Sequence, residues 1–202
     1  MSLVNISTIT TLQKSRTSEW QDQEIVLQEE GLHRFVEDNH RHNFLLWNEE
    51  DKARRDDMGP EYVYHAKRNI DQHNQKRNNC MEQIDEWITH HLQPKTSDCP
   101  IHSETPGMMI DRLSILALKE YHMRKQTLRS DTDEQHITLC QQKLEVIIAQ
   151  REQLAQCLSE FISEIEQGSR TFRVYHQFKM YNDPTLNPQL YGNKPSTAGT
   201  PV

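Results

Sequence analysis

The chain has 202 residues, of which 23 are Lys or Arg and 30 are Asp or Glu, so its formal net charge is -7. This acidic balance argues against nucleic acid or an anionic membrane as a partner, and no apolar run reaches the ~18 residues of a membrane-inserted helix. Only six Gly occur, and alternating β-branched runs are nearly absent, which argues against a β fold. The length suffices for one helical domain with its own core.

The first 18 residues are polar and lack the basic start and apolar core of a signal peptide, so we expect a flexible N-terminal arm or a short first helix. A single helical domain is predicted over residues 19–181. Residues 182–202, rich in Pro, Asn, Gly, Ser and Thr, are expected to form an extended, partly disordered tail. Four cysteines without the spacing of a disulfide framework favour reduced thiols and a cytoplasmic protein: Cys80, Cys99, Cys140 and Cys157.

The first main helix is predicted over residues 19–56, and polar residues lie on a face that should be apolar. Steps of three and four residues place them on the same side as Val36: His40, Asn43, Trp47, Glu50 and Arg54. Burying an unpaired polar group costs roughly 1–3 kcal/mol. The row therefore indicates a polar site within the domain.

A second helix is predicted over residues 61–91, after a break at Gly59 and Pro60. Asn74 and Arg77 interrupt its apolar stripe. Two neighbouring helices with polar centres predict a shared polar pocket.

Two further helices are predicted, over residues 106–129 and from Thr132 to Gly168. The first is apolar nearly all round and should be the most buried element. The second has an apolar stripe over four heptads, which implies a long antiparallel partner and is compatible with a homodimer. Residues 172–180 alternate in polarity, as in a strand or an extended segment. The expected fold is all-α, with four main helices in an antiparallel bundle and an extended C-terminal segment.

The two polar helix centres supply most candidate ligand-binding residues, a mixture of carboxylates, amides and guanidinium groups that suits a phosphorylated or sugar-like ligand. They are His40, Asn43, Trp47, Glu50, Asp51, Arg68, Asp71, Asn74, Arg77 and Asn78. A divalent cation is a candidate cofactor, because carboxylates on facing helices bind metals in bundles. Its ligands would be Glu50, Glu82 and Asp85. The alternative is that the carboxylates are solvated and Arg77 forms a structural ion pair with Glu50.

The start of the third helix offers free backbone N–H groups for an anion, beside Glu104, Asp111 and Arg112. The alternative is a capped helix start with a surface pair between Asp111 and Arg112. A basic, aromatic segment that contains Lys179 follows the last helix and could close over a phosphate, or could simply be an exposed stripe.

A loop between the second and third helices carries potential zinc ligands, although their spacing matches no strong zinc signature. They are His90, His91, Cys99 and His102. The alternative is an ordinary polar loop. Recognised catalytic signatures, such as a phosphate-binding Gly-rich loop or a nucleophile elbow, do not occur in the sequence.

Four blocks of sequence together resemble a bacterial family, domain of unknown function 4254. They read HxxNFxxWxxEDxAR at 40–54, KRxIDxxNQxRN at 67–78, ETPG followed by DRLSIL at 104–116, and QFKMYNDP at 177–184. Asn79 departs from the Asp expected after the second block. The resemblance implies an all-helical, soluble protein without an assigned activity, associated with glycosyltransferases and envelope polysaccharide synthesis.

We therefore expect a cytoplasmic protein whose pocket binds, and could act on, a phosphorylated or sugar-nucleotide-like small molecule. In an enzyme, Glu50, Glu82 or Asp85 would hold a cation or act as general base, and Arg77, Arg112 and Lys179 would neutralise phosphate. The alternative is a non-catalytic accessory protein that binds a glycosyltransferase or another envelope-synthesis protein. It would use the apolar surplus of the last helix and the segment that contains Phe172 and Phe178.

Overall fold

The structure is a computed structural model that describes residues 3–178, 180 and 183–191. Five long helices make up the domain, with a 3-10 turn (η1) and a short sixth helix. Their bounds are α1 (Ile6–Glu19), α2 (Gly31–Lys52), η1 (Asp56–Met58), α3 (Pro60–Leu92), α4 (Pro106–Thr127), α5 (Glu134–Glu166) and α6 (Pro188–Tyr191). No β-strand occurs among these described residues, which confirms the all-α prediction.

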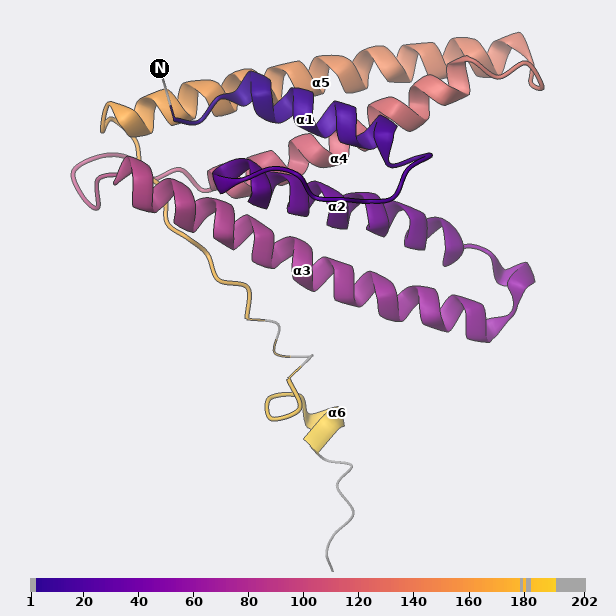
Figure 1. The fold of residues 1–202 in the computed structure, drawn as a ribbon, viewed down its shortest axis with the longest axis horizontal. Coiled ribbons are helices and arrows are strands. Elements are labelled where there is room, and N and C mark those ends of the chain that lie inside the picture. The colour runs from indigo at the N-terminus through magenta and orange to yellow at the C-terminus, as the bar shows by residue number, and fades with distance from the viewer. Residues whose placement is uncertain (1–2, 179, 181–182, 192–202) are drawn as a thin grey trace, which may run out of the picture.

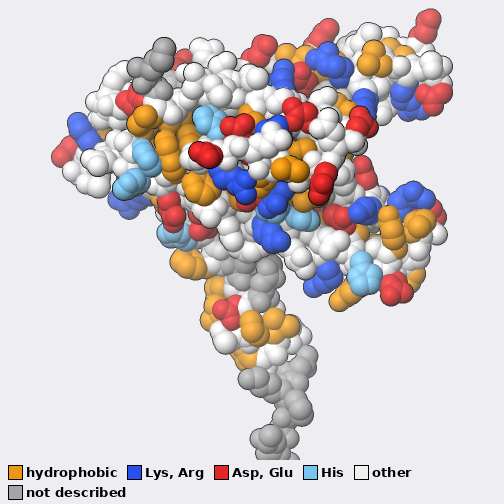
Figure 2. Space-filling model, viewed as in Figure 1, with side chains coloured by type: hydrophobic (Ala, Val, Ile, Leu, Met, Phe, Trp, Pro, Cys, Tyr) orange, Lys and Arg blue, Asp and Glu red, His pale blue; other side chains and the backbone are white. Residues whose placement is uncertain are grey.

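The helices form two antiparallel hairpins, α2 with α3 and α4 with α5, and α1 packs between them (Figure 1). The hairpins lie together at one end of the molecule and part towards the other, where Figure 2 shows the surface hollowed between them. Helix α4 contacts α1, α2, α3 and α5, as expected for the helix predicted to be the most buried. It is also the long antiparallel partner predicted for α5. Of the described helices, none is long and apolar enough to cross a membrane.

Of the two alternatives for the N-terminal segment, the short first helix is the one that forms, as α1 over residues 6–19. The first main helix begins at Gly31 rather than near residue 19. The side chain of Asn5 caps α1 by accepting a hydrogen bond from the Thr8 N–H. Helix α1 is fully packed, and Ile9 and Gln13 are both 0% exposed. Its polar buried positions hide the apolar stripe that would have identified this helix from sequence.

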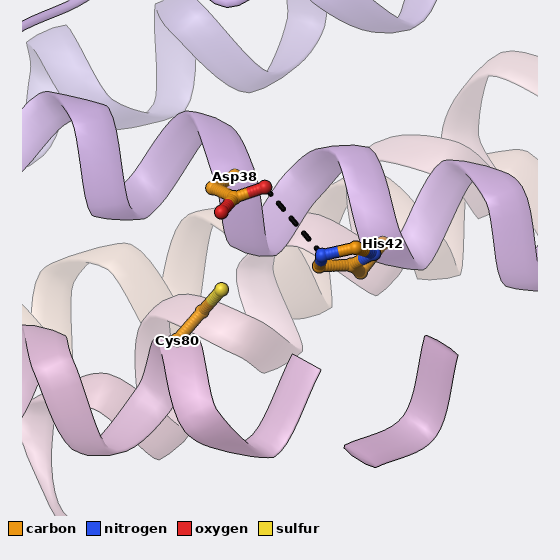
Figure 3. Close-up of side chains that lie close together, drawn as sticks. All are labelled: Asp38, His42 and Cys80. Atoms are coloured by element: carbon orange, nitrogen blue, oxygen red, sulfur yellow. Dashed lines mark ion pairs between the residues drawn. The ribbon is translucent and has the colours of Figure 1, made fainter. Parts of the chain in front are cut away.

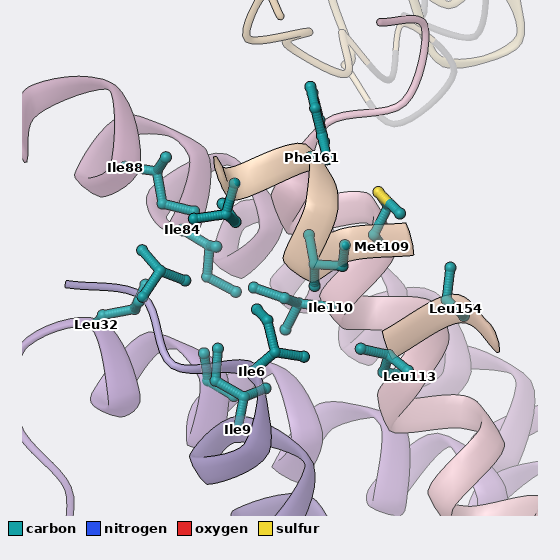
Figure 4. Packing of buried hydrophobic residues seen from close by; sticks show 14 of the residues in the cluster. Ile6, Ile9, Leu32, Ile84, Ile88, Met109, Ile110, Leu113, Leu154 and Phe161 are labelled. Atoms are coloured by element: carbon teal, nitrogen blue, oxygen red, sulfur yellow. The ribbon is translucent and has the colours of Figure 1, made fainter. Parts of the chain in front are cut away.

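One aliphatic core joins α1 to α5 (Figure 4). Its fully buried side chains include one or more from every long helix: Ile9, Val36, Ile84, Ile88, Ile110, Leu113 and Leu158. Each such side chain contributes about 1.5–3 kcal/mol relative to leaving it in water. The core lies at the end where the hairpins meet and so holds them together there.

The chain after α5 is extended, as expected. Gly168, at φ +67°, follows the end of α5, and Thr171 then forms an isolated parallel bridge with Ile101. Phe172 is only 5% exposed and packs on Phe161, so the prediction that Phe172 is a docking residue is wrong. Phe178 is 83% exposed. Of the predicted tail, residues 183–191 form a turn and α6, and the rest lies outside the described residues.

Candidate functional site

A polar cavity of ≈ 330 Å³ lies between α2, α3 and α4. Six of the predicted ligand-binding residues line it, four from α2 and two from α3. They are Asn43, Trp47, Glu50, Asp51, Asn74 and Arg77. The predicted pocket shared by the polar centres of the first two main helices is therefore present, and an apolar wall from α2 and α4 completes it.

Asp111 lies beneath this cavity, buried to 4% exposure, and faces polar side chains from two helices. Its Oδ1 accepts hydrogen bonds of 2.9 Å from Asn39 Nδ2 and from Asn43 Nδ2. Arg77 Nε lies 3.5 Å from the same oxygen and makes an ion pair without a hydrogen bond. Two expectations from the sequence are therefore wrong. Arg77 pairs with Asp111 and not with Glu50, and Asp111 is buried and does not form a surface pair with Arg112.

His40 continues this network deeper into the domain, and its hydrogen bonds determine its tautomer. Thr17 Oγ1 donates to Gln13 O at 2.8 Å, so it must accept from His40 Nε2 at 2.9 Å. His40 Nδ1 then accepts from Ser114 Oγ at 2.7 Å, while Ser114 accepts from Asn43 Nδ2 at 3.0 Å. Burial, with a smaller contribution from a nearby arginine, lowers the pKa of His40 to about 3. His40 is therefore a neutral structural support beneath the cavity.

The rim of the cavity is more exposed and carries both charges. The ring of Trp47 stacks on His122 of α4 at 4.4 Å between centroids, with an interplanar angle of 6°. Glu50 Oε2 pairs with Arg54 Nη1 at 2.8 Å one helical turn away. Burial lowers the pKa of His122, and the neighbouring Asp51 opposes that change. The rim thus offers an aromatic wall and two carboxylates.

Other predicted ligand-binding residues lie outside this cavity. Arg68 and Asp71 pair with each other at 3.2 Å on the exposed face of α3. Arg112 Nη1 donates to both carboxylate oxygens of Glu104, at 2.6 and 2.8 Å, beside a separate cavity of ≈ 620 Å³ between α4 and α5.

Two predicted residues remain to be placed. Asn78 is buried in α3 but does not line the cavity. Lys179 lies outside the described residues.

The predicted carboxylate metal site does not form. Asn69 Nδ2 donates to Glu49 Oε2 at 3.1 Å, so the end of α2 lies level with residue 69 of α3. Glu82 lies 13 residues further along α3, about 20 Å away at 1.5 Å per residue, and it accepts from His176 Nδ1 instead. Asp85, whose pKa burial raises to about 7, accepts from the backbone N–H of Gly107 at 2.6 Å.

The predicted zinc loop is likewise not gathered into a metal site among the described residues. The ring of His91 stacks on Trp87 at 3.8 Å, while His102 packs on Phe161 at 4.4 Å. All four cysteines are free thiols, as expected.

Sequence reasoning found His40 and Asp111 but missed two other residues beneath the cavity, Asn39 and Ser114, and it missed the apolar wall. Asn39 lies one turn before Asn43, and Ser114 three residues after Asp111, so helical spacing from known polar positions could have found both. The wall is formed by Leu46, Ile115 and Leu118. Apolar residues of this kind carry no signal that separates a cavity wall from the core.

Comparison with known proteins gives one match. The family described as "Protein of unknown function (DUF4254)" matches residues 33–174, more than two-thirds of the chain. No curated protein matches. No solved structure matches either.

Proposed function

The chain belongs to the DUF4254 family, whose function is unknown, and we propose that it binds a small phosphorylated, sugar-like molecule in the cavity between α2, α3 and α4. The observation that carries this proposal is the state of Arg77. Its side chain lines the cavity, is 26% exposed, and makes no hydrogen bond through its guanidinium nitrogens to any described residue. A guanidinium group held in this way is suited to a phosphate or carboxylate, which it can bind with two parallel hydrogen bonds.

The remaining lining residues suit the hydroxyl-rich part of such a ligand. Both N–H groups of the Asn43 amide are used by Asp111 and Ser114, which leaves its Oδ1 as an acceptor. Glu50 and Asp51 add further acceptors for sugar hydroxyls, and Trp47 gives an aromatic surface. The volume of ≈ 330 Å³ lies at the small end of the ~300–1,000 Å³ range of ligand sites.

Thermal unfolding of the full chain with sugar phosphates, nucleotide sugars and inorganic phosphate tests the proposal. A ligand specific for the folded state adds ~2.7 kcal/mol at a hundredfold excess over its Kd, so the melting temperature should rise by several degrees. The Arg77→Gln variant should lose this rise. The matched control Arg68→Gln, also on α3 but outside the cavity, should keep it. Equal shifts in both variants would place the ligand elsewhere.

The accessory-protein alternative uses different surfaces. Leu139 and Val146 of α5 are 47% and 56% exposed beside a groove between α4 and α5, and Phe178 is also exposed. These residues could dock a glycosyltransferase or another envelope-synthesis protein, the partner class implied by the family resemblance. The absence of a stabilising ligand across the whole panel would favour this alternative over the small-molecule proposal.

A further inference from the structure

A second group of polar side chains lies where α2 faces α3. Its two α2 residues, Asp38 and His42, immediately precede Asn39 and Asn43 in the sequence. We propose that Asp38, His42 and Cys80 bind a transition-metal ion of the Zn²⁺ class, independently of the ligand cavity. One ligand atom from each of the three lies within 4.8 Å of the others, and no other group of three or more such residues occurs in the described part of the chain. Figure 3 shows Asp38 and His42 on α2 facing Cys80 on α3.

The geometry is close to that of a bound ion. Asp38 Oδ1 and His42 Nε2 are 3.5 Å apart. Tetrahedral Zn²⁺ with bonds of about 2.1 Å separates its ligand atoms by about 3.4 Å. The third ligand atom, Cys80 Sγ, lies within 4.8 Å of both. His42 and Cys80 are each 3% exposed, so they are held in place by packing. Three protein ligands leave a fourth position open for water, the arrangement found at catalytic zinc sites.

A neighbouring histidine offers the second ring nitrogen of His42 the hydrogen-bond partner that a metal ligand needs. His42 Nδ1 lies 3.1 Å from His73 Nδ1, so one hydrogen must lie between the two nitrogens. When His42 donates that hydrogen, its Nε2 carries a lone pair directed towards Asp38. Metal-bound histidines characteristically donate their second ring N–H in this way, which fixes the tautomer and the ring.

A positively charged side chain already lies at this point. Arg41 Nη2 lies 2.6 Å from Asp38 Oδ1 and 3.3 Å from His42 Nε2, between two of the proposed ligand atoms. Yet neither Asp38 Oδ1 nor Arg41 Nε has a hydrogen bond of acceptable geometry, although both are buried. The Arg41 side chain is 32% exposed and can turn outwards. We infer that the guanidinium nitrogen and the metal ion compete for the same position.

The ligand set determines the class of ion. Thiolate and imidazole favour Zn²⁺ and Co²⁺ over Mg²⁺ and Ca²⁺, which prefer oxygen ligands. On binding, the Cys80 thiol loses its proton to solvent, and metal–oxygen, metal–nitrogen and metal–sulfur bonds form. The contact between Arg41 and Asp38 is lost. The metal is not oxidised or reduced.

Titration of the metal-free, full-length protein with Co²⁺ tests the site, because a thiolate ligand gives cobalt a charge-transfer absorption band in the near ultraviolet. One equivalent should saturate the band, and Zn²⁺ should abolish it. The Cys80→Ser variant should lose the band. The matched controls Cys157→Ser and Cys140→Ser should keep it, although Cys140 lies 3.4 Å from a histidine on α5. A band that survives in Cys80→Ser, or is absent from the unmodified protein, would overturn the proposal.

Two conservative variants keep the test decisive if Cys80→Ser fails to fold. Asp38→Asn retains the shape and the thiol but removes the anionic ligand, and should weaken Co²⁺ binding at least tenfold. Arg41→Gln removes the competing cation and should tighten binding severalfold. Unchanged affinity in both would overturn the assignment of the ion to this position.

Discussion

Helices α2 and α5 bury opposite kinds of side chain. Six of the ten buried residues of α2 are polar, whereas α5 buries eight residues of which only Arg151 is charged. The buried polar groups of α2 are matched by partners from α1, α3 and α4, and they lie beside both proposed sites. Apolar burial on α5 stabilises the domain, while polar burial on α2 fixes how the other helices are placed around it.

The apolar side of this comparison predicts the largest loss of stability. Leu158 of α5 is 0% exposed, and Leu158→Ala should lower the free energy of unfolding by about 4 kcal/mol through lost burial and a residual cavity. Urea denaturation measures the change. Leu139→Ala, on the exposed side of α5, should cost less than about 1 kcal/mol. Similar losses at both positions would mean that α5 is not packed as described.

Removing one partner from the buried polar groups of α2 should lower the free energy of unfolding almost as much. Glu37, 0% exposed, accepts from Arg16 Nε at 2.7 Å and from the backbone N–H groups of Gln28 and Glu29. Glu37→Ala should lower the free energy of unfolding by about 3 kcal/mol, because a buried cation and two backbone donors lose their acceptor. The exposed Glu24→Ala should change it by less than about 0.5 kcal/mol. A small loss at Glu37 would show that water replaces the carboxylate.

Lowering the pH should destabilise the domain through the buried His40 of α2. The pKa of His40 is about 3 in the folded protein and near 6.5 when unfolded, so the unfolded state takes up the proton first. Above about pH 6.5 the free energy of unfolding does not depend on the protonation of His40. Below that pH it falls by up to about 1.4 kcal/mol per pH unit towards pH 3 because of this residue. In His40→Gln this part of the slope should vanish.

The comparison must also account for other groups that titrate in the same pH range. Burial also lowers the pKa of His42, to about 4, and its share of the acid slope should be common to His40→Gln and the unmodified protein. Chemical denaturation between pH 7 and pH 4 measures both slopes. Identical slopes in the two proteins would mean that His40 is protonated in the fold, contrary to the tautomer derived from Thr17 and Ser114.

Local sequence determined the helices and most of one wall of the cavity. Pro60, Thr105 and Gly168 mark real helix boundaries, since their effects on the backbone and on capping are local. The three- and four-residue spacing of Asn43, Trp47 and Glu50 likewise places them on one face in any helix. Asn74 and Arg77 could be assigned to the same cavity because their helix is the next in the chain.

Only the tertiary structure decided which polar groups meet. The register of the α2–α3 hairpin separates Glu50 from Glu82, which the sequence analysis had paired, and brings Cys80 to Asp38, which it had not. Packing against α4 buries Asp111 instead of leaving it on the surface. The sequence could not decide between an arm and a short helix at α1, because the buried Gln13 Nε2 and Thr17 Oγ1 find their partners far along the chain. Periodicity reports which way a side chain points on its own helix, whereas its partner depends on contacts between distant segments.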